Sequence, residues 1–332
     1  MSKVVVITGA SAGVGRAAAR AFAQRGDRVA LIARGRAGLA AAAREVEEAG
    51  GMPLELALDV ADAQAVEAAA ERVEQELGPI DVWVNNAMTA VLAEVVETTP
   101  EEFRRVTEVT YLGSVHGAQA ALRRMLPRDR GTIVQVGSAL ARRGIPLQAT
   151  YCGAKHALDG FVDSLRTELE HRRSDVHVTL VQLPGLNTTQ FHWVRARTAN
   201  EPMPVPPIFQ PELAAKAIVW ASEHRRRELW VGLPTALTIV GDRLAPWIAD
   251  RWLARTGFDS QQTSRPLARD RPDYLFEPLD DERDHGVHGA FGAQAHRRDP
   301  QLWLGTHRRA VLAGLGAGAA ASATFARRRL RG

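Results

Sequence analysis

Short runs of β-branched residues alternate with longer, alanine-rich amphipathic stretches over the first two-thirds of this 332-residue chain. Each run suits one strand, and the stretches between the runs carry apolar residues at helical spacing. Strands that are joined by helices pair in parallel, because each helix carries the chain back to the same end of the sheet. The pattern therefore predicts an α/β fold built around a parallel sheet.

Seven runs are predicted as strands, namely residues 4–8, 28–33, 54–58, 81–85, 132–137, 176–183 and 229–232. Six helices are predicted between them, at residues 13–25, 36–49, 63–77, 100–125, 150–171 and 211–223. The fourth helix has a clear start, because Thr99 suits an N-cap and Pro100 a first helical position. Two glutamates then follow at the positive end of the helix dipole.

The composition changes twice along the rest of the chain. Residues 1–256 are expected to form one domain, in which a proline-interrupted loop at 186–211 lies beside the site and a helical pattern at 234–256 is broken at a proline. Residues 257–305 are polar and lack apolar periodicity, so we expect them to be extended or poorly ordered unless they wrap a partner subunit. Residues 306–332 form an Ala/Gly/Arg-rich tail.

The net charge of +4 comes from arginines scattered along the chain, without a stripe of basic residues interleaved with aromatic ones. A nucleic-acid partner is therefore not predicted. The tail holds an apolar run at 310–326 between arginine clusters, which is too short and too weakly hydrophobic for a stable membrane span. Two interpretations stay open for it: a weak peripheral contact with an anionic membrane, or a frayed helix.

Hydrophobic residues make up 45% of the chain and charged residues 24%, which excludes a disordered, collagen-like or disulfide-based protein. Cys152 is the only cysteine, so no internal disulfide can form, and this fits a reducing cytosol. The first residues read as a strand that stops at a glycine-rich turn, not as a signal sequence. We therefore expect a cytoplasmic location.

A glycine-rich turn follows the first strand directly and leads into a helix. Glycines there let the backbone approach a pyrophosphate, which rests on the amides at the positive end of the helix. The predicted cofactor contacts in this turn are Gly9, Ser11, Ala12, Gly13, Val14 and Gly15. A Walker phosphate loop is the rival, but Arg16 stands where that loop needs a lysine followed by Ser or Thr.

The end of the second strand carries Arg34 and Arg36 and no acid. A carboxylate at this corner would accept the adenosine ribose hydroxyls of NAD, whereas guanidinium groups attract the 2′-phosphate of NADP. The sequence therefore predicts NADP(H) as the cofactor in preference to NAD(H).

Ser138, Tyr151 and Lys155 form the candidate catalytic set. Tyr151 and Lys155 are four residues apart on a predicted helix, so the ammonium can lie beside the phenol and lower its pKa. A phenol with a lowered pKa is a usable proton donor. Ser138 ends an apolar strand and can hydrogen-bond a carbonyl oxygen.

Further motifs accompany these residues: Asp59-Val60 after the third strand, Asn85-Asn86-Ala87 after the fourth, and Pro184-Gly185 with Thr188 after the sixth. Together with the glycine turn and the catalytic set, they make residues 1–232 resemble the short-chain dehydrogenase/reductase family.

The resemblance implies a Rossmann-type, doubly wound, mainly parallel seven-stranded sheet with helices on both faces, followed by a C-terminal extension. It also implies hydride transfer between nicotinamide and a carbinol or carbonyl carbon. Combined with Arg34 and Arg36, it leads us to expect that residues 1–256 are an NADP-binding catalytic domain acting on a secondary alcohol or ketone. By motif position, Tyr151 is the acid and base, Ser138 holds the substrate oxygen, and Lys155 binds the nicotinamide ribose. The remaining implied cofactor contacts are Asp59, Val60, Asn86, Ala87, Pro184, Gly185 and Thr188. The family likeness also implies a homodimer or homotetramer.

Two positions depart from the family pattern. Met88 stands where the family usually has a glycine, which adds bulk near the cofactor. Thr110 corresponds to the family's helix asparagine in the proton relay and offers a hydroxyl in place of an amide. These departures leave open a catalytically weak nucleotide-binding regulator on the same fold. A membrane-tethered interaction protein on this fold, with the tail as its functional part, is the other alternative.

Six of the seven tryptophans lie after residue 190. Four side chains near the loop at 186–211 are predicted to line an apolar substrate pocket, namely Phe191, Trp193, Met203 and Phe209. Four tryptophans are interpreted as packing residues, namely Trp220, Trp230, Trp247 and Trp252. The expected substrate is a lipophilic small molecule.

A metal site at His285 and His288 is not favoured, because the two histidines lie in a polar segment and the chemistry needs no metal.

Overall fold

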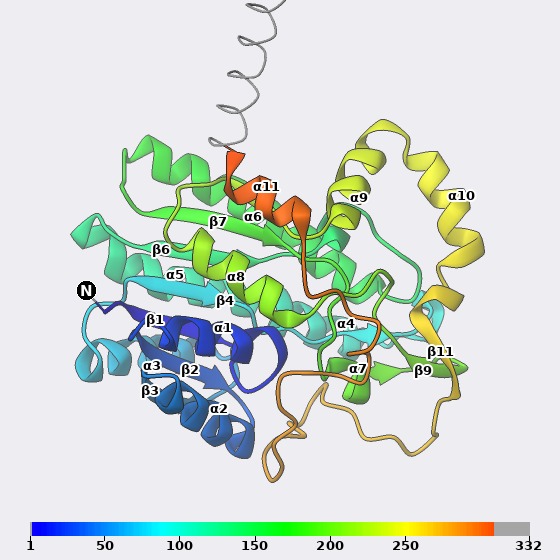
Figure 1. Ribbon diagram of the computed structural model, residues 1–332, viewed down its shortest axis with the longest axis horizontal. Helices are drawn as coiled ribbons and strands as arrows, with labels where there is room; N and C mark the ends of the chain where they lie inside the picture. The colour runs from blue at the N-terminus through cyan, green and yellow to red at the C-terminus, as the bar shows by residue number, and fades with distance from the viewer. Residues whose placement is uncertain (1, 309–332) are drawn as a thin grey trace, which may run out of the picture.

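The structure, a computed structural model, describes residues 2–308. Its centre is a seven-stranded sheet in the order β10-β7-β6-β4-β1-β2-β3, and every neighbouring pair is parallel (Figure 1). The strands are β1 (Val4–Thr8), β2 (Arg28–Ala33), β3 (Met52–Ala57), β4 (Val82–Asn85), β6 (Thr132–Val136), β7 (His177–Gln182) and β10 (Glu228–Trp230). The expected doubly wound α/β fold is confirmed.

Helices cover both faces of the sheet, and each face has its own core (Figure 1). One face packs against α1 (Gly13–Ala23), α2 (Arg36–Glu48) and α8 (Pro211–Ala221). The other packs against α3 (Ala63–Glu76), α5 (Gly113–Met125) and α6 (Ala149–His171). Alternate residues of β1 serve the two cores, with Val5 and Ile7 in the first and Val4 and Val6 in the second. Burial on both faces explains why the strands are continuous apolar runs in the sequence.

The predicted helix at 100–125 is continuous but changes type along its length. It begins with α4 (Pro100–Val106), passes through a π-helix (Thr107–Leu112) and continues as α5. Its start is the predicted cap, since the Thr99 hydroxyl accepts from the amide of Glu102 and the Glu102 carboxylate accepts from the amide of Thr99. π-Turns within helices often mark functional sites.

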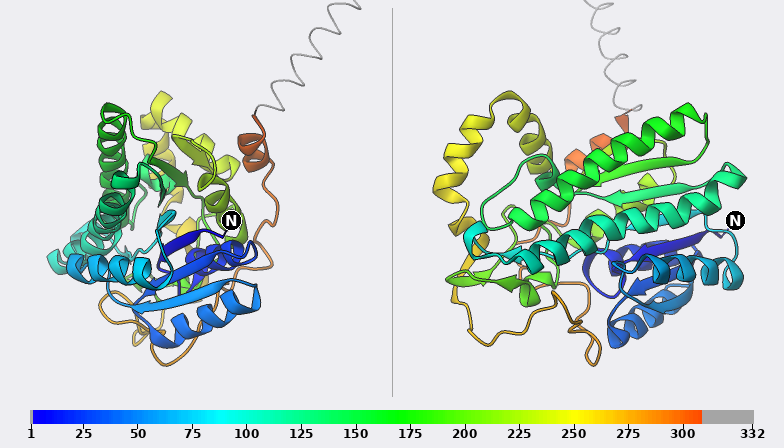
Figure 2. Two further views of the ribbon diagram at one scale, coloured as in Figure 1. Left: turned by 90° about the vertical axis from the view of Figure 1, so that its left-hand side faces the viewer. Right: turned by 180° about the vertical axis from the view of Figure 1, so that it is seen from behind.

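A helical hairpin stands away from the sheet near its carboxyl end (Figure 2). It consists of α9 (Leu233–Leu244) and α10 (Pro246–Thr256), and the break falls at the predicted proline. Shorter elements lie at the same end. They are β5 (Val91–Leu92) with β8 (Arg195–Ala196), β9 (Asn200–Pro202) with β11 (Gln262–Pro266), and α7 (Gln190–Trp193).

After β11 the chain runs without regular structure along the outside of the molecule to α11 (Pro300–Thr306) (Figures 1 and 2). We call residues 274–291 the strap. Its first amide, of Tyr274, donates to the carbonyl of Trp193 at 3.1 Å, and its last, of Phe291, donates to Oδ1 of Asn187 at 2.9 Å. The strap therefore lies directly on the loop that follows β7.

No helix within residues 2–308 is long and apolar enough to cross a bilayer. The apolar run at 310–326, on which the membrane-contact expectation rests, lies outside the described residues.

Candidate active site

One cavity of about 760 Å³ opens at the carboxyl ends of the strands. Its wall includes the turn after β1, the ends of β2, β4, β6 and β7, one face of α6, and the α9–α10 hairpin. The strand order reverses between β1 and β4, and ligands of doubly wound sheets bind at such a switch point.

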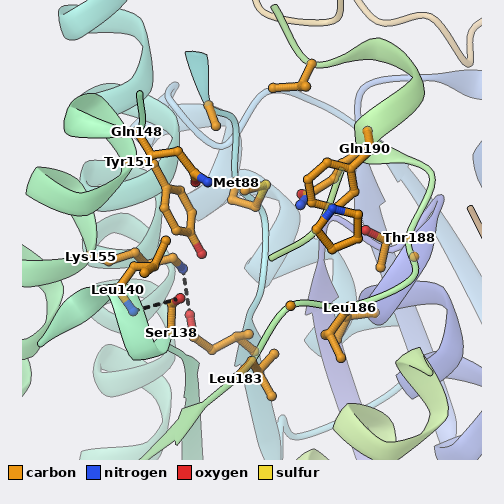
Figure 3. A pocket seen from close by; sticks show the side chains of 18 of the residues that line it. Met88, Ser138, Leu140, Gln148, Tyr151, Lys155, Leu183, Leu186, Thr188 and Gln190 are labelled. Atoms are coloured by element: carbon orange, nitrogen blue, oxygen red, sulfur yellow. Dashed lines mark hydrogen bonds between the residues drawn. The ribbon is translucent and has the colours of Figure 1, made fainter. Parts of the chain in front are cut away.

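Ser138, Tyr151 and Lys155 meet at one wall of this cavity (Figure 3). Ser138 lies two residues after the end of β6, and its hydroxyl accepts from the amide of Leu140 at 3.1 Å. Lys155 is buried, and its Nζ donates to the carbonyl of Val136 at 2.6 Å. The same nitrogen lies 5.6 Å from the centroid of the Tyr151 ring. Strand β6 and helix α6 thus bring the three predicted catalytic side chains together.

Burial controls the titration of this set. It raises the pKa of the Tyr151 phenol, and a hydrogen bond with Ser138 opposes that shift only in part. Burial also lowers the pKa of Lys155 to about 8, against the opposing charge of Asp159. The phenol pKa therefore moves upward, contrary to the sequence expectation, because loss of solvent outweighs any effect of the neighbouring amine. A protonated phenol is the form that can donate to a carbonyl oxygen.

The glycine turn is shaped for close approach of a ligand. Gly9 and Gly13 adopt φ angles of +67° and +51°, which L side chains rarely adopt. Asn86 fastens the turn to β4, since its Nδ2 donates to the carbonyls of Thr8 and Gly9 at 3.0 and 3.2 Å. Among the described residues no side chain caps the start of α1, and its first turn carries no acid. The amides there are suited to a pyrophosphate, so the turn fits a dinucleotide.

The family model for short chain dehydrogenases matches residues 3–199 of the chain. The protein is a short-chain dehydrogenase. Members of this family are NAD(P)-dependent oxidoreductases of alcohol and carbonyl groups, and this chain is one of them.

Individual relatives and one solved structure agree with the family. The chain is 32% identical over 266 residues to the oxidoreductase YxnA of Bacillus subtilis, covering 80% of this chain and 75% of the relative. It is 37% identical over 178 residues to a 3-oxoacyl-[acyl-carrier-protein] reductase of Bos taurus, covering 54% of this chain and 74% of that one. An alcohol dehydrogenase of Thermococcus sibiricus, solved with 5-hydroxy-NADP, superimposes with a TM-score of 0.61 at 29% identity, covering 70% of this chain and 96% of its own.

Most of the predicted site residues of this short-chain dehydrogenase line the cavity. They are Gly9, Ser11, Ala12, Gly13, Val14, Arg34, Asp59, Val60, Asn86, Ala87, Ser138, Tyr151, Lys155, Pro184, Gly185 and Thr188. Gly15, Arg36 and Thr110 lie outside the wall that the described residues form. Gly15 lies beneath the turn, where a Cβ would come within 2.1 Å of the carbonyl oxygen of Gly9. Arg36 is exposed at the start of α2.

Thr110 is buried on the π-helix and is bonded to the main chain of Thr89. Its Oγ1 accepts from the amide of Thr89 at 3.0 Å and donates to the carbonyl of the same residue at 2.9 Å. The hydroxyl proton is therefore already engaged, and Thr110 contacts the cavity wall through Thr89, which lines it.

The strap supplies cavity residues that sequence reasoning missed, namely Tyr274, Pro278, Leu279 and Asp280. Met88, the unusual residue after β4, meets one of them, since Oη of Tyr274 lies 3.8 Å from its Sδ. The bulk at position 88 thus packs against the strap. In the sequence, residues 257–305 are mainly polar with a few apolar residues among them. Those few residues do not reveal where the segment binds.

Two of the four side chains predicted to line the substrate pocket do so, and two do not. Phe191 and Trp193 line it as predicted, whereas Met203 and Phe209 lie outside it and pack in separate apolar clusters. Trp247 and Trp252 are 55% and 61% exposed, so interpreting them as packing residues was wrong. Trp252 lines the cavity from α10.

Proposed function

We propose that this short-chain dehydrogenase transfers a hydride between NADP(H) and a lipophilic secondary alcohol or ketone, with Tyr151 as the general acid and base. One observation carries the proposal: Ser138, Tyr151 and Lys155 line the same cavity as the glycine turn at the start of α1. A proton donor and a dinucleotide cradle in one cavity are what a carbonyl reduction requires.

The nicotinamide cofactor supplies the hydride, or accepts it, when bound. The amides at the start of α1, which no side chain among the described residues caps, would hold its pyrophosphate, and Asp59 and Val60 would border the adenine. Lys155 would bind the nicotinamide ribose, while Asn86, Ala87, Pro184, Gly185 and Thr188 would flank the rest of the groove. Arg34 and Arg36 are the guanidinium groups that would attract a 2′-phosphate toward the end of β2. The NADP analogue bound to the Thermococcus sibiricus enzyme supports this choice of cofactor.

The proton that the substrate oxygen receives comes from a side chain of this chain, which regains a proton from solvent afterwards. In reduction the Tyr151 phenol donates its proton to the carbonyl oxygen of the substrate, and Ser138 donates a hydrogen bond to the same oxygen. The raised pKa of Tyr151 keeps the donor protonated at neutral pH. Thr110 is a positioning residue, because it holds the main chain of Thr89 at the cavity wall from both sides.

Apolar side chains at the outer end of the cavity support a lipophilic substrate. Leu140, Phe191 and Trp193 line it from the domain, and Leu237 and Trp252 line it from the hairpin. Leu237 and Trp252 are also 63% and 61% exposed, so the apolar surface continues from the cavity to solvent. Family likeness further supports a homodimer or homotetramer, which light scattering would test. The single cysteine supports a cytoplasmic location, which cell fractionation would test.

The test is a panel of ketones of increasing chain length, followed by NADPH absorbance, with wild type and the Tyr151→Phe variant. We expect kcat/KM to rise with chain length and to fall by about two to four orders of magnitude in the variant. NADPH affinity measured by calorimetry should change little, because the phenyl ring is retained. Ketone reduction unaffected by the substitution would refute the mechanism. Tight nucleotide binding without reduction of any ketone would instead favour a nucleotide-binding regulator.

A further inference from the structure

The strap is fastened at the adenosine corner of the groove by arginines of the Rossmann fold. Three successive strap carbonyls accept hydrogen bonds there. Those of Tyr274 and Phe276 bond to the guanidinium of Arg34, and that of Leu275 bonds to Nε of Arg105 at 3.0 Å. Arg34, the residue expected to bind a 2′-phosphate, therefore already donates to the strap.

The next part of the strap closes the start of α2. The amides of Gly38 and Ala37 donate to the carbonyls of Asp280 and Asp281 at 3.0 and 3.2 Å, and the amide of Arg36 donates to Oδ1 of Asp281 at 3.1 Å. Gly35 contributes no side-chain cap to this helix, so the strap satisfies the first amides in its place. The chain thus brings a segment almost 250 residues away in sequence to the corner that follows β2.

Asp280 directs a carboxylate into this corner. The residue is only 8% exposed, and it lines the same cavity as Arg34 and Asp59. Its side chain fills the space above two glycines: a Cβ would lie 1.9 Å from its Oδ1 at Gly35 and 2.5 Å from its Oδ2 at Gly38. No donor within residues 2–308 forms a hydrogen bond to that carboxylate. The carboxylate faces the cavity with its acceptor positions free, so a ligand with hydroxyl groups would complete it.

The position of this carboxylate has a direct consequence for the cofactor. In dinucleotide-binding folds an acid near the end of the second strand accepts the adenosine ribose hydroxyls. That strand ends here at Ala33 and is followed by Arg34, and Asp280 brings the missing acid from the strap. A 2′-phosphate at the same place would add negative charge beside a carboxylate in a site of low solvent access, where like charges repel strongly.

We propose that Asp280 is a cofactor-specificity residue of this dehydrogenase, supplied by the strap. Its carboxylate binds the adenosine ribose hydroxyls and opposes the 2′-phosphate that Arg34 and Arg36 attract. The preference between NADP(H) and NAD(H) is therefore set by a balance between the guanidinium groups that follow β2 and the carboxylate that the strap supplies. This inference rests on the proposed function, because it needs the adenosine half of the cofactor in this corner.

The experiment is titration calorimetry of the full chain with NADP⁺ and with NAD⁺. Asp280→Asn removes the charge and keeps the shape, so we expect the Kd for NAD⁺ divided by the Kd for NADP⁺ to rise about tenfold. Asp281→Asn is the matched control, since it removes an equal charge one residue further along the strap from an exposed side chain outside the cavity wall. That ratio should change less than about threefold in the control.

Asp280→Ser serves as a second variant and should shift the ratio in the same direction. An unchanged ratio in both Asp280 variants, or an equal change in the Asp281 control, would overturn the role of Asp280 while leaving nucleotide binding intact. Failure of the wild type to bind either nucleotide would overturn the proposed function and this inference together.

Discussion

The Rossmann half of the molecule and the strap are stabilised by different interactions. The half that spans β1 to β10 is held by two apolar cores, one on each face of the sheet. The strap has few apolar anchors, among them Leu275, Val287 and Phe291, and its other contacts are carbonyls and carboxylates bound to arginines and helix amides. The stabilisation from apolar burial is shared among many side chains, whereas each polar contact depends on one partner. Substitutions should therefore have global effects in the first region and local effects in the second.

The largest effect on stability is expected in the Rossmann core. Phe22 on α1 is fully buried, and Phe22→Ala should lower the free energy of unfolding by about 3–5 kcal/mol. Phe291 in the strap is the matched control, because it is 8% exposed and its ring makes an edge contact with Phe191. Phe291→Ala should cost only about 1–2 kcal/mol, since a segment at the surface can relax around the gap. Equal losses in urea unfolding would contradict the distinction between the two regions.

A smaller loss is expected where one arginine joins the two regions. Arg16 on α1 is 3% exposed and bonds both Glu45 on α2 and Asp284 in the strap. Arg16→Met should cost about 2 kcal/mol, less than a fully buried pair would, because both carboxylates remain partly solvated. Asp284→Asn is the control, since it removes only the strap contact and should cost at most about 1 kcal/mol. If the two variants lost the same stability, the contact with Glu45 would contribute nothing.

The same contrast explains what the sequence could predict. The strands were predicted to within two residues at each end, as at β3, predicted at 54–58 and found at Met52–Ala57, because burial on both faces leaves a continuous apolar signal. The catalytic set was found because its spacing on α6 follows from helix geometry. The strap could not be located, because its place depends on single bonds such as that of Arg34 to the carbonyl of Tyr274. Backbone acceptors are the same in every residue, so they leave no trace in the sequence.

A local effect is expected when the clamp on the strap is removed. Arg34→Gln deletes the guanidinium that bonds the carbonyls of Tyr274 and Phe276. Hydrogen exchange of the amides of Tyr274 and Leu275 should accelerate about tenfold, while the amides of β1 and β4 stay protected. Arg20→Gln is the control, because Arg20 is half-exposed on α1 and its ion pair with Glu45 does not reach the strap. Faster exchange throughout the sheet would mean that the strap is part of the global folding unit.

The smallest effect is a pH dependence that belongs to the catalytic wall and not to the strap. The pKa of Lys155 is lowered to about 8 by burial, so its amine is mostly charged at pH 7 and mostly neutral at pH 9. A charged amine makes the stronger hydrogen bond to a ribose hydroxyl, so the Kd for NADP⁺ should rise about threefold between these values. The strap carboxylate of Asp284 has a pKa below its usual range because it bonds Arg16, so its contribution to stability is present above about pH 4 and is lost only as the pH falls further. The strap contact therefore stays constant over the interval in which Lys155 titrates.

Lys155→Met should bind NADP⁺ more weakly and with no pH dependence from 7 to 9, as measured by calorimetry. A slope that survives this substitution would assign the titration to another group.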